Sequence, residues 1–357
     1  CDGLDDGAID LGISGGVAPY GSVWNGPGGF TSMNEDINGL GAGTYTVDIT
    51  DANGCTTQQS ATITASAPID LSVFVSDYGD VNIPCSGANT GVIEATISGG
   101  AGSLDILWSG PNGFSSTDAM LNGLVAGDYT LSISDINGCS LDTTISLIEP
   151  DSSIGASMSA AIQPSGSNVS CFSGSDGSID LSVSGGVSPY DITWHGPAGT
   201  SYSTEDPTGL AAGHYDLVIT DVNGCSFTDS IDLTGPDSAL MASIDISQYN
   251  GGFNTSCDGN SDGYITVGLA GGSGAYQLSW SGPGGFSSSA DSIGGLQEGI
   301  YTLTVTDMNG CALTEEVNIV APDPITWELV AASFPSGTNI SCHGMNDGSI
   351  SASLSGG

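Results

Sequence analysis

Apolar and polar residues alternate over short segments of this chain, in a pattern that returns at nearly constant intervals. In the segment 210–225, Tyr215, Leu217 and Ile219 alternate with mostly polar neighbours. One face of such a segment is apolar and the other polar, which predicts a half-buried β-strand. The Asn-Gly pair at 223–224 favours a tight hairpin turn, because both residues tolerate positive φ. We therefore expect one strand followed by a hairpin.

Near copies of this segment occur at 40–55, 124–139 and 296–311, each with a Gly two residues before its Tyr. The Leu-x-x-Gly-x-Tyr lead-in resembles the tyrosine corner of immunoglobulin-like sandwiches. The cysteines that close the copies are 84, 86 and 86 residues apart, and four tryptophans keep the same spacing: Trp24, Trp108, Trp194 and Trp280. A unit of about 85 residues can bury its own core. The sequence thus predicts an all-β chain of tandem immunoglobulin-like β-sandwich repeats forming an elongated rod, with the Trp in each core.

Prolines after each closing strand mark the predicted repeat boundaries, because a proline cannot donate to a β-ladder. They are Pro68, Pro150, Pro236 and Pro322. The predicted repeats are 1–67 (repeat 1, first strand missing), 68–149 (repeat 2), 150–235 (repeat 3), 236–321 (repeat 4) and 322–357 (repeat 5, truncated). We expect the chain to be a window on a longer polymer of such repeats.

Charge narrows the possible partners. The chain has 40 acidic residues and no Lys or Arg, which gives a formal net charge of -40 at pH 7. Nucleic acid is excluded because nothing could neutralise its phosphates, and an anionic membrane surface would be repelled. The chain has no run of 18 apolar residues, so direct membrane insertion is not predicted. Stability must come from apolar burial, β-ladders and disulfides, since no ion pair with Lys or Arg can form.

Nine cysteines at repeat-locked positions indicate an oxidising, extracellular compartment. In every unit the opening and closing cysteines are 54 residues apart, which favours bonds within a repeat. The favoured pairs are Cys1–Cys55, Cys85–Cys139, Cys171–Cys225 and Cys257–Cys311, with the partner of Cys342 outside the window. In a standard sandwich, however, the turn before the second strand and the turn after the sixth strand lie at opposite ends. A bond between neighbouring repeats, such as Cys85 to Cys225, is the alternative.

Other candidate sites have weaker support. The Asp-x-Asn-Gly turns are weak calcium candidates, but an Asx-stabilised hairpin is the favoured interpretation. Their residues are Asp51, Asn53, Asp135, Asn137, Asp221, Asn223, Asp307 and Asn309. Three Asn-x-Ser segments, starting at Asn168, Asn254 and Asn339, have the form of glycosylation sequons but share one repeat position. The histidines occupy unrelated repeat positions, so no enzyme and no cofactor is predicted.

Several motifs in fixed order resemble the SprB-type repeat of large surface adhesins in gliding bacteria of the Bacteroidota. They are Cys-x-Gly-x-x-Asp-Gly-x-Ile, then Ser-Gly-Gly-Val-x-Pro-Tyr-x-x-x-Trp, then the Leu-x-x-Gly-x-Tyr strand with its Asp-x-Asn-Gly-Cys turn, clearest in 171–225. Repeat 2 departs from the pattern, with Asn89-Thr90-Gly91 in place of Asp-Gly. The resemblance implies a secreted surface filament, and it carries no catalytic residues.

We therefore expect a structural stalk of a very large secreted adhesin at the cell surface, linked to surface attachment or gliding motility. Its partners would be a surface substratum, polysaccharide or other cells, bound through regions outside this window. Two alternatives remain open. One is an extracellular filament or sheath that self-associates without an adhesive tip. The other is a carbohydrate-binding module array that uses Trp24 and its equivalents.

Overall fold

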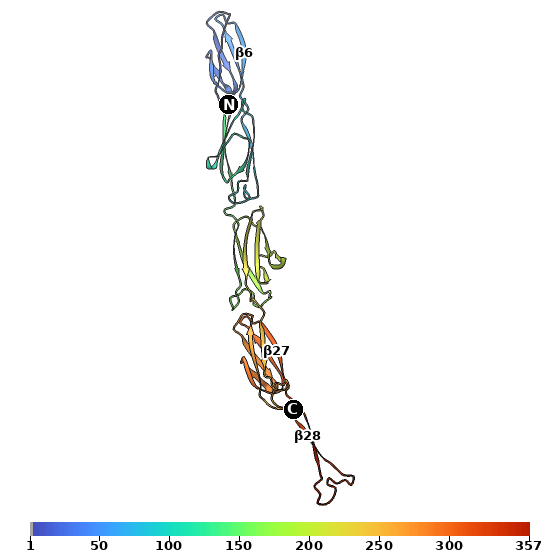
Figure 1. Ribbon diagram of the computed structural model, residues 1–357. Coiled ribbons are helices and arrows are strands. Elements are labelled where there is room, and N and C mark those ends of the chain that lie inside the picture. The colour runs from blue at the N-terminus through green and yellow to red at the C-terminus, as the bar shows by residue number, and fades with distance from the viewer. Residues whose placement is uncertain (1–2) are drawn as a thin grey trace. The chain divides into compact units, whose positions relative to one another are not determined.

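The structure, a computed structural model, describes residues 3–357 (Figure 1). In this range the regular structure is β-strand apart from four single-turn 3₁₀ helices, which confirms the all-β prediction. None of these helices is long or apolar enough to cross a lipid bilayer. The range divides into two compact units. The first holds the described residues up to 155 with 185–190 and 220–225, and the second holds 156–184, 191–219 and 226–357.

The strands have nearly the same lengths from one repeat to the next. Up to residue 147 they are β1 (Gly7–Ile9), β2 (Gly21–Asn25), β3 (Thr31–Ser32), β4 (Ile37–Leu40), β5 (Gly43–Thr50), β6 (Thr56–Ile63), β7 (Asp70–Val75), β8 (Gly91–Ser98), β9 (Asp105–Ser109), β10 (Ser115–Ser116), β11 (Met120–Leu124), β12 (Gly127–Ser134) and β13 (Ser140–Leu147).

Repeats 3 and 4 and the last segment continue the series. Their strands are β14 (Gly155–Ala160), β15 (Gly177–Ser184), β16 (Tyr190–His195), β17 (Ser201–Tyr202), β18 (Thr208–Leu210), β19 (Gly213–Asp221), β20 (Ser226–Leu233), β21 (Met241–Ile246), β22 (Gly263–Ala270), β23 (Gln277–Gly282), β24 (Phe286–Ser288), β25 (Ser292–Leu296), β26 (Gly299–Thr306), β27 (Ala312–Ile319), β28 (Thr326–Ala331) and β29 (Ile350–Ser355). The 3₁₀ turns are η1 (Pro27–Gly29), η2 (Pro111–Gly113), η3 (Pro197–Gly199) and η4 (Pro283–Gly285).

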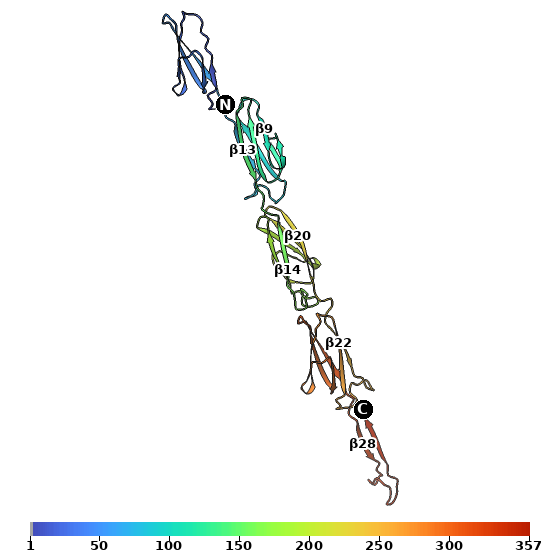
Figure 2. The same ribbon diagram turned by 90° about the vertical axis from the view of Figure 1, so that its left-hand side faces the viewer.

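Repeats 2, 3 and 4 each contain a three-stranded and a four-stranded sheet. In repeat 2 the strand orders are β11-β8-β7 and β10-β9-β12-β13, and Figure 2 labels β9 and β13 of the second sheet. The other orders are β14-β15-β18 with β17-β16-β19-β20, and β21-β22-β25 with β24-β23-β26-β27. In repeat 1 the pair β1-β4 accompanies β3-β2-β5-β6, and β28 pairs with β29 in a hairpin (Figure 1). Seven strands in two sheets make the immunoglobulin-like sandwich that was predicted.

Each core lies between the two sheets of its own repeat. In repeat 2, Ile93 and Leu121 of the smaller sheet join Trp108 and Leu131 of the larger one in a single buried cluster. Repeats 1 and 4 have separate buried clusters, each built around its own Trp and Tyr. The four repeat tryptophans are at most 2% exposed, which confirms them as core residues. A side chain this deeply buried offers no face on which a sugar ring could stack, so the carbohydrate alternative loses its proposed platform.

The predicted tyrosine corner is present in all four repeats. The Tyr215 hydroxyl donates a hydrogen bond to the carbonyl of Ala211 (2.9 Å), four residues upstream. Tyr45, Tyr129 and Tyr301 make the same bond over the same separation. The Gly two residues before the Tyr is required here, because Gly213 has a φ of 147° and a Cβ would lie 2.3 Å from the ring of Pro197. The corner fixes the start of the strand that leads into the closing turn.

Each boundary proline lies between the last strand of one repeat and the first strand of the next. Pro68, for example, falls between β6 and β7, and Pro236 falls between β20 and β21. The exact limits of the repeats stay a prediction. The segments on either side of these prolines carry the cysteines considered next.

Candidate functional site at the repeat junction

Among the described cysteines, two disulfides join an opening cysteine to the next repeat. Cys85 bonds to Cys225 and Cys171 bonds to Cys311, with Cα–Cα distances of 5.7 and 5.8 Å. Each pair is separated by 140 residues, and each lies inside one compact unit. The first cysteine of each pair precedes the second strand of its own repeat, while the other closes the Asp-x-Asn-Gly turn of the following repeat. We call the first segment the opening loop and the second the closing turn.

The predicted bonds within repeats are therefore wrong, and the alternative pairing is the one formed. In repeat 4, Cys257 precedes β22, whereas the closing turn meets the far end of that strand, where Ser273 N donates to Asp307 (2.8 Å). An eight-residue strand spans about 26 Å, far beyond the roughly 6 Å between the Cα atoms of a disulfide. The two cysteines of one sandwich thus lie at opposite ends.

Cys55, Cys139 and Cys257 also depart from the predicted pairs, whereas the predicted partner of Cys342 lies outside the window. Cys55, Cys257 and Cys342 are free and exposed. Cys139 is disulfide-bonded, but not to Cys85, because Cys85 is bonded to Cys225. Cys1, the predicted partner of Cys55, lies outside the described residues. The opening loop of repeat 4 and the closing turn of repeat 1 each present an unused thiol.

An aspartate organises each closing turn. In repeat 4, one oxygen of Asp307 accepts the N–H groups of Asn309 (3.0 Å) and Cys311 (2.9 Å), and the other accepts Ser273 N. Asp51, Asp135 and Asp221 make the equivalent three bonds. The carboxylates, which were also weak calcium candidates, are thus directed at backbone amides. Among residues 3–357 no group of three or more His, Cys, Asp or Glu side chains could hold a metal ion.

These hydrogen bonds lower the pKa of the aspartate in the closing turns of repeats 1 and 2. Burial alone would raise the pKa of Asp135, but the N–H groups of Ala101, Cys139 and Asn137 outweigh it and lower the pKa. The pKa of Asp51 is lowered as well, with the N–H of Cys55 as the largest cause. The closing turns of repeats 1 and 2 are therefore held by ionised carboxylates at neutral pH, and each of these turns positions the cysteine that follows it.

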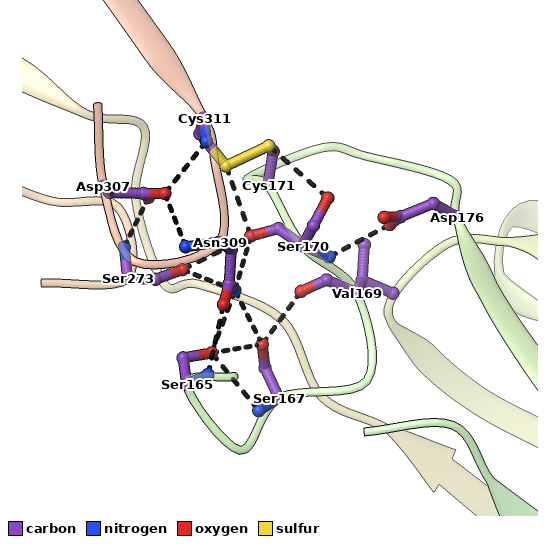
Figure 3. The surroundings of a disulfide bond; sticks show 10 residues. All are labelled: Ser165, Ser167, Val169, Ser170, Cys171, Asp176, Ser273, Asp307, Asn309 and Cys311. Carbon is purple, nitrogen blue, oxygen red and sulfur yellow. Dashed lines mark hydrogen bonds between the residues drawn. A yellow bond between two sulfur atoms is a disulfide. The ribbon is translucent and has the colours of Figure 1, made fainter. Parts of the chain in front are cut away.

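Asn309 connects the two repeats at the Cys171–Cys311 junction (Figure 3). Its Nδ2 group lies within hydrogen-bonding distance of Ser165 Oγ (2.9 Å), Ser167 Oγ (3.3 Å) and the carbonyl of Ser170 (3.0 Å). Its Oδ1 accepts the N–H of Ser165 (3.1 Å). Within its own repeat, Nδ2 also reaches Ser273 Oγ (2.8 Å). The asparagine thus orients the closing turn on the opening loop beside the disulfide.

The sequence did not identify this contact, although Asn309 was a weak calcium candidate. A usable signal was present in the opening loops. Ser165-Gly-Ser167 recurs as Ser336-Gly-Thr338 at the same distance before a cysteine, whereas the other opening loops have Gly and Val or Gly and Phe there. The paired hydroxyls are specific to two of the repeats.

The Cys85–Cys225 junction provides a natural comparison. Its closing turn has the same asparagine, Asn223, but its opening loop has Gly79 and Val81 where the other has two serines. Among the described residues, Asn223 Nδ2 is buried and has no hydrogen-bond partner. The amide is satisfied at one junction and unsatisfied at the other, because the opening loops differ.

Replacing the asparagine is expected to have unequal effects at the two junctions. Asn309→Ala removes several hydrogen bonds to exposed and half-buried partners, and we expect a loss of about 1–3 kcal/mol in the free energy of unfolding of repeats 3 and 4. Asn223→Ala removes an amide without a partner and is expected to cost less than about 0.5 kcal/mol or to stabilise. Urea denaturation of both variants measures the difference. Equal losses would contradict the assigned role of Asn309.

The opening loops are also tied to their own repeats. Asn168 Oδ1 accepts the N–H of Thr234 (2.9 Å), and its Nδ2 donates to the carbonyl of Ala161 (2.9 Å). Asn254 makes the same two kinds of bond, to Val320 N and to the Ser247 carbonyl. These sequon asparagines therefore have a structural role, in which their amide groups connect the opening loop to the ends of two strands.

Aspartates accept hydrogen bonds from the serine that precedes the cysteine in three of the opening loops. Asp262 accepts both the N–H and the hydroxyl of Ser256, and the Ser256 hydroxyl is the largest cause that lowers the pKa of Asp262. The pKa values of Asp176 and Asp347, at the same repeat position, are lowered by Ser170 and Ser341. Repeat 2 has Thr90 there, where the sequence departs from the repeat pattern.

The lowered pKa of Asp262 predicts a pH-dependent contribution to stability. A carboxylate with a depressed pKa stabilises the fold above its unfolded pKa near 3.8, and this contribution is lost as the pH falls through the folded value. We expect wild type to exceed Asp262→Ala in urea midpoint at pH 7 and the gap to close near pH 2. Comparing the variant with wild type at each pH cancels most of the electrostatic repulsion that the two proteins share. A gap that stays constant with pH would contradict the prediction.

His214 lies outside the junction. Its ring nitrogens lie 2.7 Å from Asp232 and 3.2 Å from Asp216, on the exposed face of the larger sheet. The hydrogen bond to Asp232 is the main reason that the pKa of His214 is raised. The contact with Asp232 links β19 to β20, whereas Asp216 lies on the same strand as His214, so the group fits local stabilisation of the sheet.

Comparisons with known proteins find one repeat family and several solved structures of low identity. No curated protein matches the chain. Similar solved structures include the N-terminal eight Ig domains of Down Syndrome Cell Adhesion Molecule, with 10% identity and a TM-score of 0.28, covering 92% of this chain and 60% of that one. A Ca²⁺-stabilised adhesin with which an Antarctic bacterium binds ice has 14% identity, coverages of 89% and 94%, and a TM-score of 0.33. A tetra-tandem repeat from the extending region of a large adhesion protein has 17% identity, coverages of 85% and 92%, and a TM-score of 0.26.

The TM-scores are too low for these alignments to carry a structural or functional conclusion. The chain spans 60% of the length of the first of these proteins. The family comparison is more specific, because it matches residues 165–199 to the SprB repeat. This segment contains Ser165, Ser167 and Cys171, which form the opening side of the second junction. The resemblance to SprB-type repeats is thus confirmed for residues 165–199, a segment that includes the opening loop bonded to the closing turn of the next repeat.

Proposed function

We propose that this chain is a stalk segment of a very large secreted cell-surface adhesin, in which each repeat is covalently coupled to the next. The observation that carries the proposal is the pairing of Cys85 with Cys225 and of Cys171 with Cys311. A disulfide inside one sandwich protects only that sandwich. A disulfide between neighbours keeps both connected through sulfur even when the backbone between them unfolds. The function is then mechanical, and the chain is not an enzyme.

The chemistry of the junction supports a location outside the cell. Structural disulfides persist in oxidising compartments and are rare in the cytosol. The chain has no Lys or Arg, so its junctions rely on sulfur bonds and on uncharged hydrogen bonds such as those of Asn309. Coulombic repulsion from the charge of -40 favours separation of neighbouring copies, which suits an exposed polymer.

The SprB match supports the finer part of the proposal. Repeats of this type imply a surface filament of gliding bacteria, and we propose that the stalk serves surface attachment or gliding motility. The groups that bind a substratum, polysaccharide or another cell would lie on other parts of the same protein. The segment described here would project those groups and transmit load to them.

Surface labelling of intact source cells tests location and coupling together. We expect an antibody raised against repeat 3 to label cells without permeabilisation. We also expect Cys171 and Cys311 to resist alkylation on intact cells and to react only after a reductant is added. Labelling that requires permeabilisation would contradict the surface location. Ready alkylation of Cys171 would contradict the covalent coupling.

A further inference from the structure

The two disulfide junctions have the same covalent parts. We call the Cys85–Cys225 contact the first junction and the Cys171–Cys311 contact the second junction. All four cysteines are half-buried. The sulfur of the closing cysteine lies 3.2 Å from the carbonyl oxygen of Pro84 at the first junction and 3.3 Å from that of Ser170 at the second. A difference in reactivity between the two bonds must therefore come from the residues around them.

The hydrogen bonds across the two junctions differ. At the second junction Asn309 binds the opening loop through both atoms of its amide, and the Ser273 hydroxyl donates to the carbonyl of Ser170 (3.3 Å) (Figure 3). Within residues 3–357, no hydrogen bond joins the opening loop of repeat 2 to the closing turn of repeat 3 besides the sulfur contact with Pro84. The disulfide is thus the main connection at the first junction.

The opening loop of repeat 2 uses its hydroxyl group internally. Ser76 Oγ donates to the carbonyl of Asn82 (2.8 Å) and accepts the N–H of Val92 (3.1 Å). Repeat 4 has the same arrangement around Ser247, whose hydroxyl donates to the carbonyl of Asn254. In repeat 3, by contrast, the hydroxyls of the opening loop point across the junction to Asn309. The first junction therefore lacks an acceptor for its own asparagine.

Negative charge is similar at the two junctions. Glu149 accepts the N–H of Gly87 in the opening loop of the first junction, and Asp176 accepts the N–H of Ser170 in that of the second. Each closing turn contains one aspartate that accepts backbone N–H groups. An incoming thiolate thus meets one carboxylate on each side of either disulfide, and charge does not distinguish the two bonds.

We infer that the Cys85–Cys225 bond is a redox-sensitive joint, which a small thiol cleaves well before the Cys171–Cys311 bond. A half-buried disulfide must be uncovered by local opening before a thiolate can attack it. Opening the second junction breaks the hydrogen bonds of Asn309, whereas opening the first breaks no equivalent bond. The inference rests on the proposed covalent coupling of repeats and adds an order in which the couplings yield.

The reductant for this step is a dithiol such as dithiothreitol. Its thiolate attacks one sulfur of the disulfide, the sulfur–sulfur bond breaks, and the other cysteine leaves as a thiolate that takes up a proton. The second thiol of the reductant then attacks the mixed disulfide and releases the remaining cysteine. One protein disulfide and one dithiol thus become two protein thiols and one cyclic disulfide.

Cleavage at the first junction alone has a mechanical consequence. The shortest covalent path from Cys85 to Cys311 then lengthens from 54 backbone residues (225 minus 171) to 86 (171 minus 85). Repeats 3 and 4 stay coupled through Cys171–Cys311 while repeat 2 is released from repeat 3. Mild reduction would therefore loosen the stalk at a defined place.

The test is timed reduction of the purified full chain without denaturant. Free thiols are first blocked with N-ethylmaleimide, dithiothreitol is added in excess, and samples are quenched with iodoacetamide for peptide mapping. We expect iodoacetamide to label Cys85 and Cys225 about tenfold faster than Cys171 and Cys311, the ratio that one hydrogen bond of about 1.4 kcal/mol would produce.

Two matched variants assign the cause. Asn309→Ala is expected to speed reduction of Cys171–Cys311 about tenfold, since it removes the bonds that hold the second junction closed. Asn223→Ala removes the equivalent amide at the first junction, which has no partner, and should change the reduction rate of Cys85–Cys225 by less than about twofold. Double replacement of Ser165 and Ser167 by Ala removes the acceptors instead and should act in the same direction as Asn309→Ala.

A urea series below the unfolding transition separates local opening from unfolding of a whole repeat. Local opening exposes little surface, so the ratio of the two reduction rates should stay nearly constant. Equal rates in wild type, faster reduction of Cys171–Cys311, no acceleration by Asn309→Ala, or a ratio that disappears in dilute urea would each overturn the inference. The unreduced sample tests the proposed function separately: absence of the Cys85–Cys225 and Cys171–Cys311 peptides there would refute the covalent coupling itself.

Discussion

Stretching the oxidised chain between Cys85 and Cys311 is expected to extend that segment to no more than about 200 Å, against about 770 Å once its disulfides are reduced. With both bonds intact, the shortest covalent path crosses from Cys85 to Cys225, follows the backbone back to Cys171, and crosses to Cys311. Its backbone part contains 54 residues (225 minus 171), whereas the reduced backbone contains 226 (311 minus 85). The lengths follow from about 3.4 Å per extended residue, with the two disulfides adding 5.7 and 5.8 Å to the shorter path.

Single-molecule force spectroscopy, with handles placed just outside the two cysteines, measures this difference. Cys257→Ser is the control, because Cys257 is free and its loss should leave the extension of the oxidised chain unchanged. If cysteines were paired within repeats, the same substitution would release the 54 residues up to Cys311, about 180 Å of additional chain. A longer oxidised Cys257→Ser chain would therefore contradict the pairing between repeats.

Removing one junction disulfide is expected to have the largest effect on equilibrium stability. On the chain-entropy model, a bond that closes a loop of 140 residues stabilises the folded state by about 5 kcal/mol. We expect the double variant Cys171→Ser with Cys311→Ser to lose most of this value in urea denaturation, followed by the fluorescence of Trp194 and Trp280. Replacing both cysteines avoids exchange through a thiol left unpaired.

The same variant should also unfold less cooperatively. The two tryptophans report on different repeats, and without the disulfide their transitions are expected to separate. Cys257→Ser, which removes an exposed free thiol, should change neither stability nor cooperativity. A loss below about 1 kcal/mol in the double variant, with coincident transitions, would contradict a coupling role for the junction.

Local features of the fold could be predicted from the sequence because each depends on a short pattern. The alternation around Tyr215, Leu217 and Ile219 placed a strand with one buried face, and these three side chains are fully buried. The Leu-x-x-Gly-x-Tyr pattern predicted the tyrosine corner, and the hydroxyl bonds four residues upstream as expected. The repeat spacing of Trp194 and its equivalents indicated one core in each unit.

The disulfide pairing could not be predicted in the same way, because spacing does not distinguish the two options. The opening and closing cysteines are a constant 54 residues apart within a repeat, yet the bonded pairs are also separated by a constant 140. The direction of one strand decides which cysteines can bond, because it separates the two cysteines of a repeat. In repeat 4, Cys257 precedes β22 and the Asp307 turn meets its far end, so the nearest partner of each turn belongs to a neighbouring repeat.

The role of Asn309 escaped sequence reasoning for a related reason. An Asp-x-Asn-Gly turn has a local explanation, the Asx hydrogen bonds of Asp307, and nothing in the turn shows that the asparagine amide faces another repeat. The partner residues Ser165 and Ser167 are 144 and 142 residues away. The one related pattern in the sequence is the recurrence of two hydroxyl side chains before Cys171 and Cys342.

Non-reducing peptide mapping tests most directly whether neighbouring repeats are covalently linked. The chain has no Lys or Arg, so the digestion needs a protease that cuts at acidic or aromatic residues. The structure predicts a peptide that joins Cys171 to Cys311 and another that joins Cys85 to Cys225. Peptides that instead join Cys171 to Cys225 and Cys257 to Cys311 would contradict it.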